Sequence, residues 1–357
     1  MRYKLLLLIL LSSLLAVVIV GCGADDVAAP DPNGSEVAPP AGLTHLRFTL
    51  DWAVQGPQAP FLVALDKGYF AEEGLSVVID RGFGSADAVS KIAGGAYNLG
   101  YADVNSMIEF NANNPNEALI AIAMVLDYAP FAILTLSDRG ITTVQDLEGR
   151  TLGAPAGDAP RRLFPAFART VGIDVNSVEW TSMDPPLREP LLIQGEVDAI
   201  SGFYFTSFLN LTAGGVAEND IVAFLYAEHG LELYGNAVIV PPSLIEANPE
   251  AMRGFLRALT RAWHDTLADP EEAIAIIKRR DPLIDEEVEL ARLNLAIEAN
   301  MLTPDVRERG FGDVRLDRLE EAIGIVVETF DLPATPAPEQ VFDGSFLPPL
   351  EDRLPRS

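Results

Sequence analysis

Apolar and polar residues along the chain follow two alternating periods. Leu46, Phe48 and Leu50 recur at every second position, which predicts a short strand with one buried face. Residues 61–70 then show the three- and four-residue spacing of a helix, and residues 76–79 form a second apolar strand. This β-α-β order is typical of a largely parallel sheet.

The same alternation continues through most of the chain and predicts the α/β class. Beyond residue 249 the pattern is mainly helical, and Pro249 and Pro270 suit first-turn positions of helices. The further predicted strands are 99–101, 119–126, 151–153, 178–180, 197–200, 222–226 and 233–240. The further predicted helices are 85–92, 160–171, 187–194, 251–267, 270–278, 286–299 and 316–327.

One short pattern occurs twice. Residues 92–99 and residues 192–199 both end a helix with a glycine and then enter a strand through Asn98 or Asp198. Glycine supplies the left-handed conformation of such a helix cap without a steric penalty. The repeat fits two similar lobes, and it fits equally well the general use of this cap in α/β proteins.

These patterns divide the folded part of the chain into two lobes. We predict a first lobe of residues 44–135 plus 229–330, because the C-terminal helices are expected to pack on the first sheet, and a second lobe of residues 136–228. Residues 331–357 are rich in proline and are expected to wrap the surface or to stay loose.

The N-terminus has the pattern of an export signal. Arg2 and Lys4 precede an uninterrupted run of apolar or small residues over 5–20, which predicts a secretory signal over residues 1–21. The alternative is a membrane-spanning anchor. The run, however, is shorter than the ~20 residues that a spanning helix needs.

The end of this signal resembles a bacterial lipobox. The motif is Ile-Val-Gly-Cys over residues 19–22, although Val20 stands where a small residue is more usual. The resemblance implies cleavage before Cys22 and attachment of a lipid to its sulfur. Residues 22–43 are small, acidic and proline-rich, which predicts a flexible tether. The protein is therefore expected to be exported and lipid-anchored to the cell membrane, in an extracytoplasmic or periplasmic location.

Composition excludes several classes of function. Cys22 is the only cysteine, so the lipidated chain would have no free thiol for a disulfide, a nucleophile or a zinc site. The formal net charge of −27 disfavours any nucleic-acid partner, because such a surface repels phosphates. The three histidines show no metal-ligand spacing. We therefore expect no cofactor, no metal and no nucleic acid.

Polar and aromatic residues follow the predicted strands of the first lobe. Asp51 and Trp52 follow the first strand, residues 82–86 follow the second, and residues 101–103 end the third. Carboxyl ends of parallel strands meet at one edge of a sheet, where ligands bind. Trp52 offers a stacking face or is a buried core indole, and Asp51 accepts ligand hydrogen bonds or caps a turn. Ser85 binds a ligand or is an N-cap.

The second lobe offers a comparable set. Gly157 to Ala159 precede a helix that begins at Pro160, and Tyr204 follows the strand 197–200 as a stacking candidate. Arg161 and Arg162 suit a carboxylate or sulfonate, or they form a solvated helix face. The complete set of predicted ligand-binding residues is Asp51, Trp52, Phe83, Ser85, Ala86, Tyr101, Asp103, Tyr128, Gly157, Ala159, Arg161, Tyr204, Glu228 and Tyr234.

Two stretches of the first lobe carry a family resemblance. Residues 50–52 (LDW) and 60–75 (PFLVALDKGYFAEEGL) resemble the opening of substrate-binding proteins related to thiamine-pyrimidine, sulfonate and nitrate binders. Residues 146–153 and 191–199 add weaker matches. The resemblance implies a type II periplasmic-binding-protein-like fold, with two lobes that each contain a mostly parallel sheet flanked by helices.

The resemblance also implies a function. A monomeric binding protein of this kind captures a small organic molecule and delivers it to an ABC permease and ATPase complex. The ligand implied is a pyrimidine, a thiamine precursor or a related heterocycle, and the alternative is an organic sulfonate or another anion. Residues 203–208 lack the glutamate that the pyrimidine-binding branch tends to carry there, which argues against a thiamine precursor.

Two other functions compete with transport. A relative of this superfamily makes the thiamine pyrimidine, so a biosynthetic enzyme is one rival, and a surface sensor is the other. The chain has no recognisable phosphate loop, and an exported protein is separated from cytosolic cofactors. We therefore expect a binding protein and not an enzyme.

Overall fold

A computed structural model describes residues 42–356 of the chain. The predicted signal sequence, the predicted lipidation site Cys22 and nearly all of the predicted tether lie outside these residues. Within residues 42–356, none of the helices combines the length and the apolar character needed to cross a bilayer.

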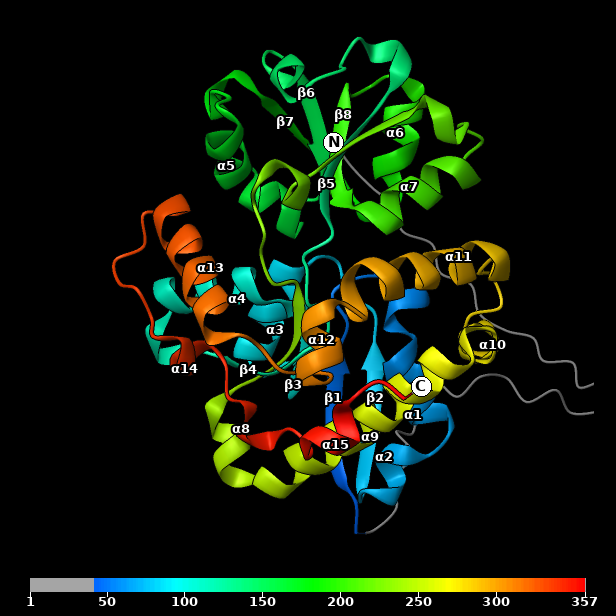
Figure 1. The fold of residues 1–357 in the computed structure, drawn as a ribbon, viewed down its shortest axis with the longest axis vertical. Helices are drawn as coiled ribbons and strands as arrows, with labels where there is room; N and C mark the ends of the chain where they lie inside the picture. The colour runs from blue at the N-terminus through cyan, green and yellow to red at the C-terminus, as the bar shows by residue number, and fades with distance from the viewer. Residues whose placement is uncertain (1–41, 357) are drawn as a thin grey trace, which may run out of the picture. The chain divides into compact units, whose positions relative to one another are not determined.

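Two five-stranded sheets form the centres of the two lobes (Figure 1). Each sheet has four strands in one direction and one antiparallel strand, which is β10 in the first sheet and β5 in the second. The first sheet has the order β2 (Leu75–Asp80), β1 (Thr44–Thr49), β3 (Leu99–Asp103), β10 (Asn236–Val240) and β4 (Ile120–Met124). The second has the order β7 (Glu179–Ser182), β6 (Thr151–Ala154), β8 (Ala199–Phe203), β5 (Phe131–Leu136) and β9 (Ile221–Leu225). The predicted two-lobed α/β fold with mostly parallel sheets is confirmed.

In each sheet the antiparallel strand is the first strand that the chain forms after it crosses from the other lobe. The chain leaves the first sheet after β4, enters the second with β5, and returns with β10. β5 therefore belongs to the second lobe, whereas the predicted first lobe extended to residue 135. All six residues of β5 are buried, so its apolar pattern does not indicate which sheet it joins.

The repeated glycine pattern occupies equivalent places in the two lobes. Gly95 (φ 74°) and Gly195 (φ 80°) are both left-handed, and each precedes the central strand of its sheet, β3 or β8. The two segments connect helix α3 to β3 and helix α6 to β8. The pattern therefore marks the internal similarity of the lobes.

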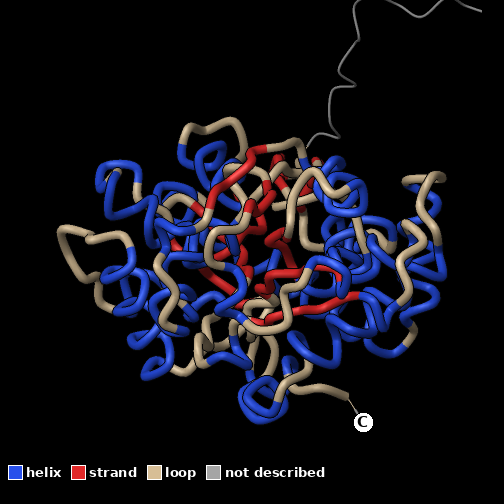
Figure 2. Tube along the Cα trace, turned by 90° about the horizontal axis from the view of Figure 1, so that it is seen from above, coloured by secondary structure: helices blue, strands red, loops and turns tan. Residues whose placement is uncertain are grey.

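Helices surround both sheets, and Figure 2 shows the strands in the interior with helices outside them. In the first lobe they are α1 (Ala59–Asp66), α2 (Tyr69–Glu72), α3 (Ser85–Ala93), α4 (Val104–Asn113), α8 (Pro242–Ala247), α9 (Pro249–Ala268), α10 (Pro270–Arg280), α11 (Glu286–Ala296), α12 (Pro304–Arg309) and α13 (Leu316–Thr329). In the second lobe they are α5 (Ala159–Val171), α6 (Arg188–Gln194) and α7 (Tyr204–Ala213).

The most specific part of the resemblance joins distant parts of the first lobe. A left-handed Gly68 (φ 76°) separates α1 from α2, where the sequence predicts one helix over 61–70. The ammonium of Lys67 donates to Asp265 on α9 (3.0 Å) and Glu272 on α10 (2.7 Å). The ring of Phe70 stacks on that of Phe255 with a centroid separation of 4.8 Å.

The proline-rich C-terminal segment packs against the first lobe as far as it is described. It contains two short helices, α14 (Pro338–Val341) and α15 (Leu350–Arg353). Phe342 forms a β-bridge with Ala121, and Arg353 donates to the carbonyl oxygen of Phe311 (3.0 Å). Of the two expectations for this segment, wrapping the surface is therefore the one observed, because its apolar side chains find buried sites between the prolines.

Phe70→Ala is expected to lower the free energy of unfolding by about 3–5 kcal/mol, because a buried ring and its stacking partner are lost. Urea unfolding followed by circular dichroism measures this. Leu283→Ala is the control, since Leu283 is 94% exposed and its loss is expected to cost less than about 0.5 kcal/mol. Equal effects of the two changes would contradict the account of this packing.

Candidate functional site

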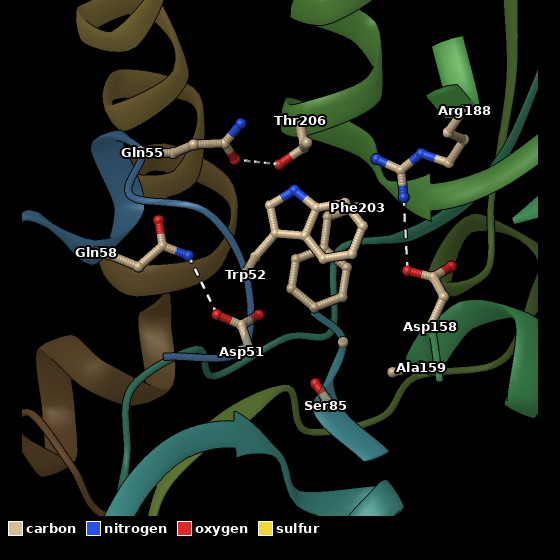
Figure 3. A pocket seen from close by; sticks show the side chains of 11 residues that line it. Asp51, Trp52, Gln55, Gln58, Ser85, Asp158, Ala159, Arg188, Phe203 and Thr206 are labelled. Atoms are coloured by element: carbon tan, nitrogen blue, oxygen red, sulfur yellow. Dashed lines mark hydrogen bonds and ion pairs between the residues drawn. The ribbon is translucent and has the colours of Figure 1, made fainter. Parts of the chain in front are cut away.

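A cavity lies between the lobes and takes its walls from both of them (Figure 3). It encloses about 340 Å³ of space between atoms, including the part that opens to solvent. Each lobe contributes residues that follow the carboxyl ends of its strands, as expected for parallel sheets. The lining residues are Asp51, Trp52, Gln55, Gln58, Gly84, Ser85, Asp158, Ala159, Arg188, Phe203 and Thr206.

Asp51 forms the polar floor of this cavity on the first lobe. Its carboxylate accepts hydrogen bonds from the side-chain amides of Asn236 (2.8 Å) and Gln58 (3.2 Å). Asp51 is 3% exposed, and burial raises its pKa to about 6, against the lowering effect of both amides. The carboxylate is thus a buried acceptor whose desolvation outweighs the stabilisation from its two uncharged donors.

Arg188 is the corresponding buried group of the second lobe. Its guanidinium lies 3.5 Å from the carboxylate of Asp158 and 2.8 Å from that of Glu189. The guanidinium carbon is 4.9 Å from the ring centroid of Trp52, which belongs to the first lobe. A buried cation paired with two carboxylates is well compensated, and its flat face lies over the indole.

Asp158 links Arg188 to the second sheet. It also accepts a hydrogen bond from the hydroxyl of Ser201 on β8 (2.9 Å). Burial raises the pKa of Asp158 to about 6, although the charge of Arg188 acts in the opposite direction. Both lobes therefore present a buried carboxylate with a raised pKa to the same cavity.

Buried polar contacts connect the lobes beside the cavity. The hydroxyl of Thr206 donates to the amide oxygen of Gln55 (3.0 Å), and Arg292 on α11 donates to the carbonyl oxygen of Thr206 (3.3 Å). Arg292 is held in turn by Glu289, whose carboxylate also accepts the backbone N–H of Gly56 (2.7 Å). The loop after β1, helix α11 and helix α7 are therefore fixed to one another.

A close backbone approach joins the lobes on another side. The N–H of Ala86 donates to the carbonyl oxygen of Gly157 (3.3 Å). Gly84 has φ 123°, and a Cβ there would lie 2.7 Å from that oxygen. Glycine is required at this position for both the conformation and the close approach.

Four predicted residues line the cavity, namely Asp51, Trp52, Ser85 and Ala159. The alternative role of Ser85 as an N-cap is not observed, because Gly84 is the N-cap of α3. The Ser85 hydroxyl instead accepts the backbone N–H of Asp103 (3.1 Å). Trp52 is not a buried core indole, since its side chain is only half-buried and lines the cavity (Figure 3).

Two predicted residues of β3 lie in the core instead. The ring of Tyr101 packs on that of Phe61 with a centroid separation of 5.1 Å. Asp103 is the N-cap of α4 and accepts the backbone N–H of Ser106 (2.8 Å). Burial raises the pKa of Asp103 to about 7. Both side chains are almost completely buried because β3 is central in the sheet, and neither lines the cavity.

Ala86, Gly157 and Phe83 lie near the cavity without lining it. Ala86 and Gly157 make the backbone contact between the lobes described above. The ring of Phe83 is 49% exposed, and the guanidinium carbon of Arg81 lies 5.0 Å from its centroid. The chain turns at Gly84, which directs Ser85 rather than Phe83 to the cavity.

Arg161, Tyr204 and Glu228 are also outside the cavity lining. Arg161 donates to the carbonyl oxygen of Ala154 (2.7 Å), and its guanidinium carbon lies 5.0 Å from the ring centroid of Trp180. The ring of Tyr204 packs against Phe208, while the preceding residue lines the cavity. Glu228 belongs to the 3₁₀ turn Ala227–His229 beyond β9.

Tyr128 and Tyr234 belong to the two crossings between the lobes and act there as structural residues. Their rings lie on the guanidinium of Arg318, at 3.9 and 4.0 Å from ring centroid to guanidinium carbon. Arg318 also donates to the carboxylate of Asp127 (3.0 Å). Helix α13 thus holds both crossings with one side chain, which explains why neither tyrosine faces the cavity.

Seven lining residues are absent from the predicted set. Gln55 and Gln58 follow Trp52 within one loop, and this adjacency is a signal that the sequence contains. Arg188 has no such signal, because it begins α6 rather than following a strand. The seven are Gln55, Gln58, Gly84, Asp158, Arg188, Phe203 and Thr206.

Comparison with known sequences identifies the family. The sequence model of the family described as NMT1/THI5 like matches residues 56–273. The chain belongs to the NMT1/THI5-like family. The resemblance seen in the sequence is therefore confirmed.

Members similar to this NMT1/THI5-like protein have different names. The riboflavin-binding protein RibY of Chloroflexus aurantiacus is 26% identical over 70% of this chain and 69% of its own. The formylaminopyrimidine-binding protein of Halalkalibacterium halodurans is 25% identical over 72% of this chain and 78% of its own. A protein of Legionella pneumophila named 4-amino-5-hydroxymethyl-2-methylpyrimidine phosphate synthase is 23% identical over 67% and 74%. The relatives thus include both binding proteins and synthases.

Solved structures support the fold of this family member. The alkanesulfonate-binding protein SsuA of Xanthomonas axonopodis pv. citri, bound to MOPS, aligns with a TM-score of 0.66 and 14% identity over 85% of this chain and 99% of its own. The nitrate-binding protein NrtA of Synechocystis aligns with a TM-score of 0.61 and 12% identity over 85% and 87%. At these identities the likeness concerns the fold.

Asp51→Asn is expected to stabilise this NMT1/THI5-like protein at pH 7.5 more than at pH 4.5. The pKa of Asp51 is about 6 in the folded protein and 3.8 as its ordinary value, so the unfolded state releases the proton first. Stability therefore falls as pH rises from about 4 to 6, and the substitution removes a penalty of roughly 2–3 kcal/mol above that range. Urea unfolding at the two pH values measures the difference.

Asp146→Asn is the matched control with the opposite sign. Backbone N–H groups of Thr142 and Thr143 lower the pKa of Asp146 to about 2, so its carboxylate stabilises the fold at neutral pH. Its removal is expected to destabilise the protein at pH 7.5, and this loss disappears as pH falls towards 2. A loss of stability in Asp51→Asn that grows with pH would refute the assignment of a buried, poorly compensated carboxylate.

Proposed function

We propose that this protein is an extracytoplasmic solute-binding protein that captures a small organic molecule for an ABC importer. One observation carries the proposal: the walls of the cavity come from both lobes, so a bound molecule would contact both. A ligand that binds the closed arrangement better than the open one drives closure. The two crossings near Tyr128 and Tyr234 are the natural hinge.

The partner and location follow from the same role. We propose that the permease and ATPase of an importer receive the closed, monomeric protein. The lipobox-like pattern ending at Cys22 supports a lipid anchor on the outer side of a membrane. A tether over residues 22–43 would keep the binding protein close to its transporter and raise the frequency of their encounters.

A planar heterocycle is the ligand that we propose. The indole of Trp52 offers a flat apolar face, while Asp51 and Gln58 offer acceptors at its edge. Relatives named for riboflavin and formylaminopyrimidine, at 26% and 25% identity, support a ring system of this kind. An organic sulfonate or another anion is the alternative ligand, in keeping with the sulfonate- and nitrate-binding proteins of similar fold.

Biosynthesis is the second candidate function, because several relatives are named as pyrimidine phosphate synthases. We favour binding without catalysis. The predicted export signal separates the chain from cytosolic substrates, and the two relatives described above at 25–26% identity are named as binding proteins. A synthase would release a phosphorylated pyrimidine, whereas a binding protein returns its ligand unchanged.

Purification without refolding, followed by native mass spectrometry, is expected to show one co-purifying molecule of small mass. After its removal, riboflavin and formylaminopyrimidine are added back, and solution scattering measures the radius of gyration. The ligand that binds is expected to reduce this radius, because the lobes close around it. Binding without any compaction, or recovery of a chemically altered ligand, would count against the proposed role.

Trp52→Ala is expected to weaken binding of that ligand about fivefold or more, since stacking on an indole contributes roughly 1 kcal/mol. Isothermal titration measures the dissociation constant. Phe83→Ala is the control, because this exposed ring lies outside the cavity lining and its loss is expected to change affinity less than twofold. Equal affinities of Trp52→Ala and the unchanged protein would eliminate the stacking role.

A further inference from the structure

Two flat groups from opposite lobes lie next to each other at the cavity. The indole of Trp52 follows β1, and the guanidinium of Arg188 begins α6. The guanidinium carbon lies 4.9 Å from the indole centroid, and Arg188 is only 1% exposed. Both residues line the cavity, so this pair occupies the place where a ligand meets both lobes (Figure 3).

The charge of Arg188 is already matched by its neighbours. Its Nε donates to Glu189 (2.9 Å), and its Nη1 donates to Asp158 (3.5 Å). Both of these acidic residues are buried as well, with 4% exposure each. The carboxylate of Asp51 lies on the opposite wall and is close enough to Asp158 for each charge to act on the other. The ionised cavity therefore carries more negative than positive charge.

This balance decides what Arg188 can bind. An arginine that recognises an anion needs free N–H groups and an uncompensated charge. The Nη2 group of Arg188 is buried without a hydrogen-bond partner among the described residues, so an N–H donor remains, but two carboxylates already match the charge of the guanidinium. Arg188 therefore meets only the first of these two requirements, and its planar group can still stack on an aromatic ring. An anion entering this cavity would meet the carboxylates of Asp51 and Asp158 in its lining, with that of Glu189 nearby on Arg188, and such like-charge contacts are unfavourable.

Gln58 indicates what the edge of the ligand carries. Its amide nitrogen donates to Asp51, and its amide oxygen has no hydrogen-bond partner among the residues that the structure describes. Gln58 is 4% exposed, so this oxygen is a buried acceptor beside a carboxylate. Buried acceptors without a partner are unfavourable, and a ligand that donates N–H groups there removes the cost.

We propose that the ligand is an uncharged or cationic planar ring with N–H donors, held between the indole of Trp52 and the guanidinium of Arg188. This inference rests on the proposed function and defines its ligand class. Contact distances of about 3.5 Å on each face require a separation of about 7 Å. The two plates therefore move apart by roughly 2 Å to admit a ring, which is a small displacement for two hinged lobes. Arg188 acts as a stacking plate and not as an anion receptor.

The test compares three probes and two arginine substitutions by isothermal titration. The probes are riboflavin, formylaminopyrimidine and MOPS, and the substitutions are Arg188→Lys and Arg161→Lys. Arg161 is the matched control, because its guanidinium lies over Trp180 at a similar distance (5.0 Å) but outside the cavity lining. Lysine keeps the positive charge of each arginine and removes its flat face.

We expect a ring probe to bind the unchanged protein and MOPS to bind it at least tenfold more weakly. Arg188→Lys is expected to weaken ring binding by roughly 5- to 30-fold, the range for a desolvated cation–π contact, and Arg161→Lys by less than twofold. Equal ring binding by Arg188→Lys and the unchanged protein overturns the stacking plate but leaves the solute-binding role intact. Preference for MOPS overturns the ligand class alone. If none of the probes binds and no small molecule co-purifies with the protein, both proposals are overturned.

If Arg188→Lys does not fold, as judged by the absence of a cooperative unfolding transition, Glu189→Gln replaces it in the test. This isosteric change removes one of the two negative charges that hold Arg188, so its guanidinium gains capacity for an anion. MOPS affinity is then expected to rise at least fivefold, while ring binding persists. Unchanged MOPS affinity in a folded Glu189→Gln protein overturns the assignment of Arg188 as a charge-compensated plate.

Discussion

Burial of charge at the meeting of the lobes is the constraint on which the rest of the structure depends. Arg188 and Arg292 are each 1% exposed, and an isolated charge in such surroundings costs several kcal/mol. Each is therefore paired, Arg188 with Asp158 and Glu189, and Arg292 with Glu289. Asp158 precedes α5, and Arg292 also donates to the carbonyl oxygen of Thr206 on α7. The paired charges therefore connect α6 to α5 and α11 to α7 beside the cavity.

The same burial that fixes these elements limits how stable they are. Asp51 and Asp158 have raised pKa values because their carboxylates are desolvated. Keeping these carboxylates ionised in the folded state therefore costs free energy. A fold selected only for stability would have little reason to keep two such groups in one cavity. Their presence on facing walls indicates a binding site in which a ligand supplies hydrogen bonds to these carboxylates.

The lobes are tied at their crossings as well as at the cavity. Arg318 on α13 lies between Tyr128 and Tyr234, one from each crossing, and donates to Asp127. Helix α13 itself packs on α4 of the first lobe and α5 of the second. Arg318 and α13 therefore hold both crossings on one side, and any hinge motion of the lobes is confined to the few residues of the crossings.

The sequence predicted where strands end, but it predicted only some of the residues that line the cavity. Asp51, Trp52, Ser85 and Ala159 line the cavity because each follows a strand or opens the next helix, and that order is visible along the chain. Tyr101 and Asp103 follow the same rule but are buried, because β3 is central and its side chains meet core neighbours on both faces. Periodicity alone does not distinguish a strand end that opens to a cleft from one that is covered.

The sequence by itself determined the alternation of strands and helices, the two-lobed α/β class and the family, because hydrophobic periods and short glycine motifs are local properties of the chain. Tertiary structure decided that β5 joins the second sheet, that Arg188 faces Trp52, and that Tyr128 and Tyr234 clamp Arg318. The contacts of Arg188 and Arg318 join residues about 80 to 190 positions apart, and only the folded packing of elements sets which of many polar side chains meet.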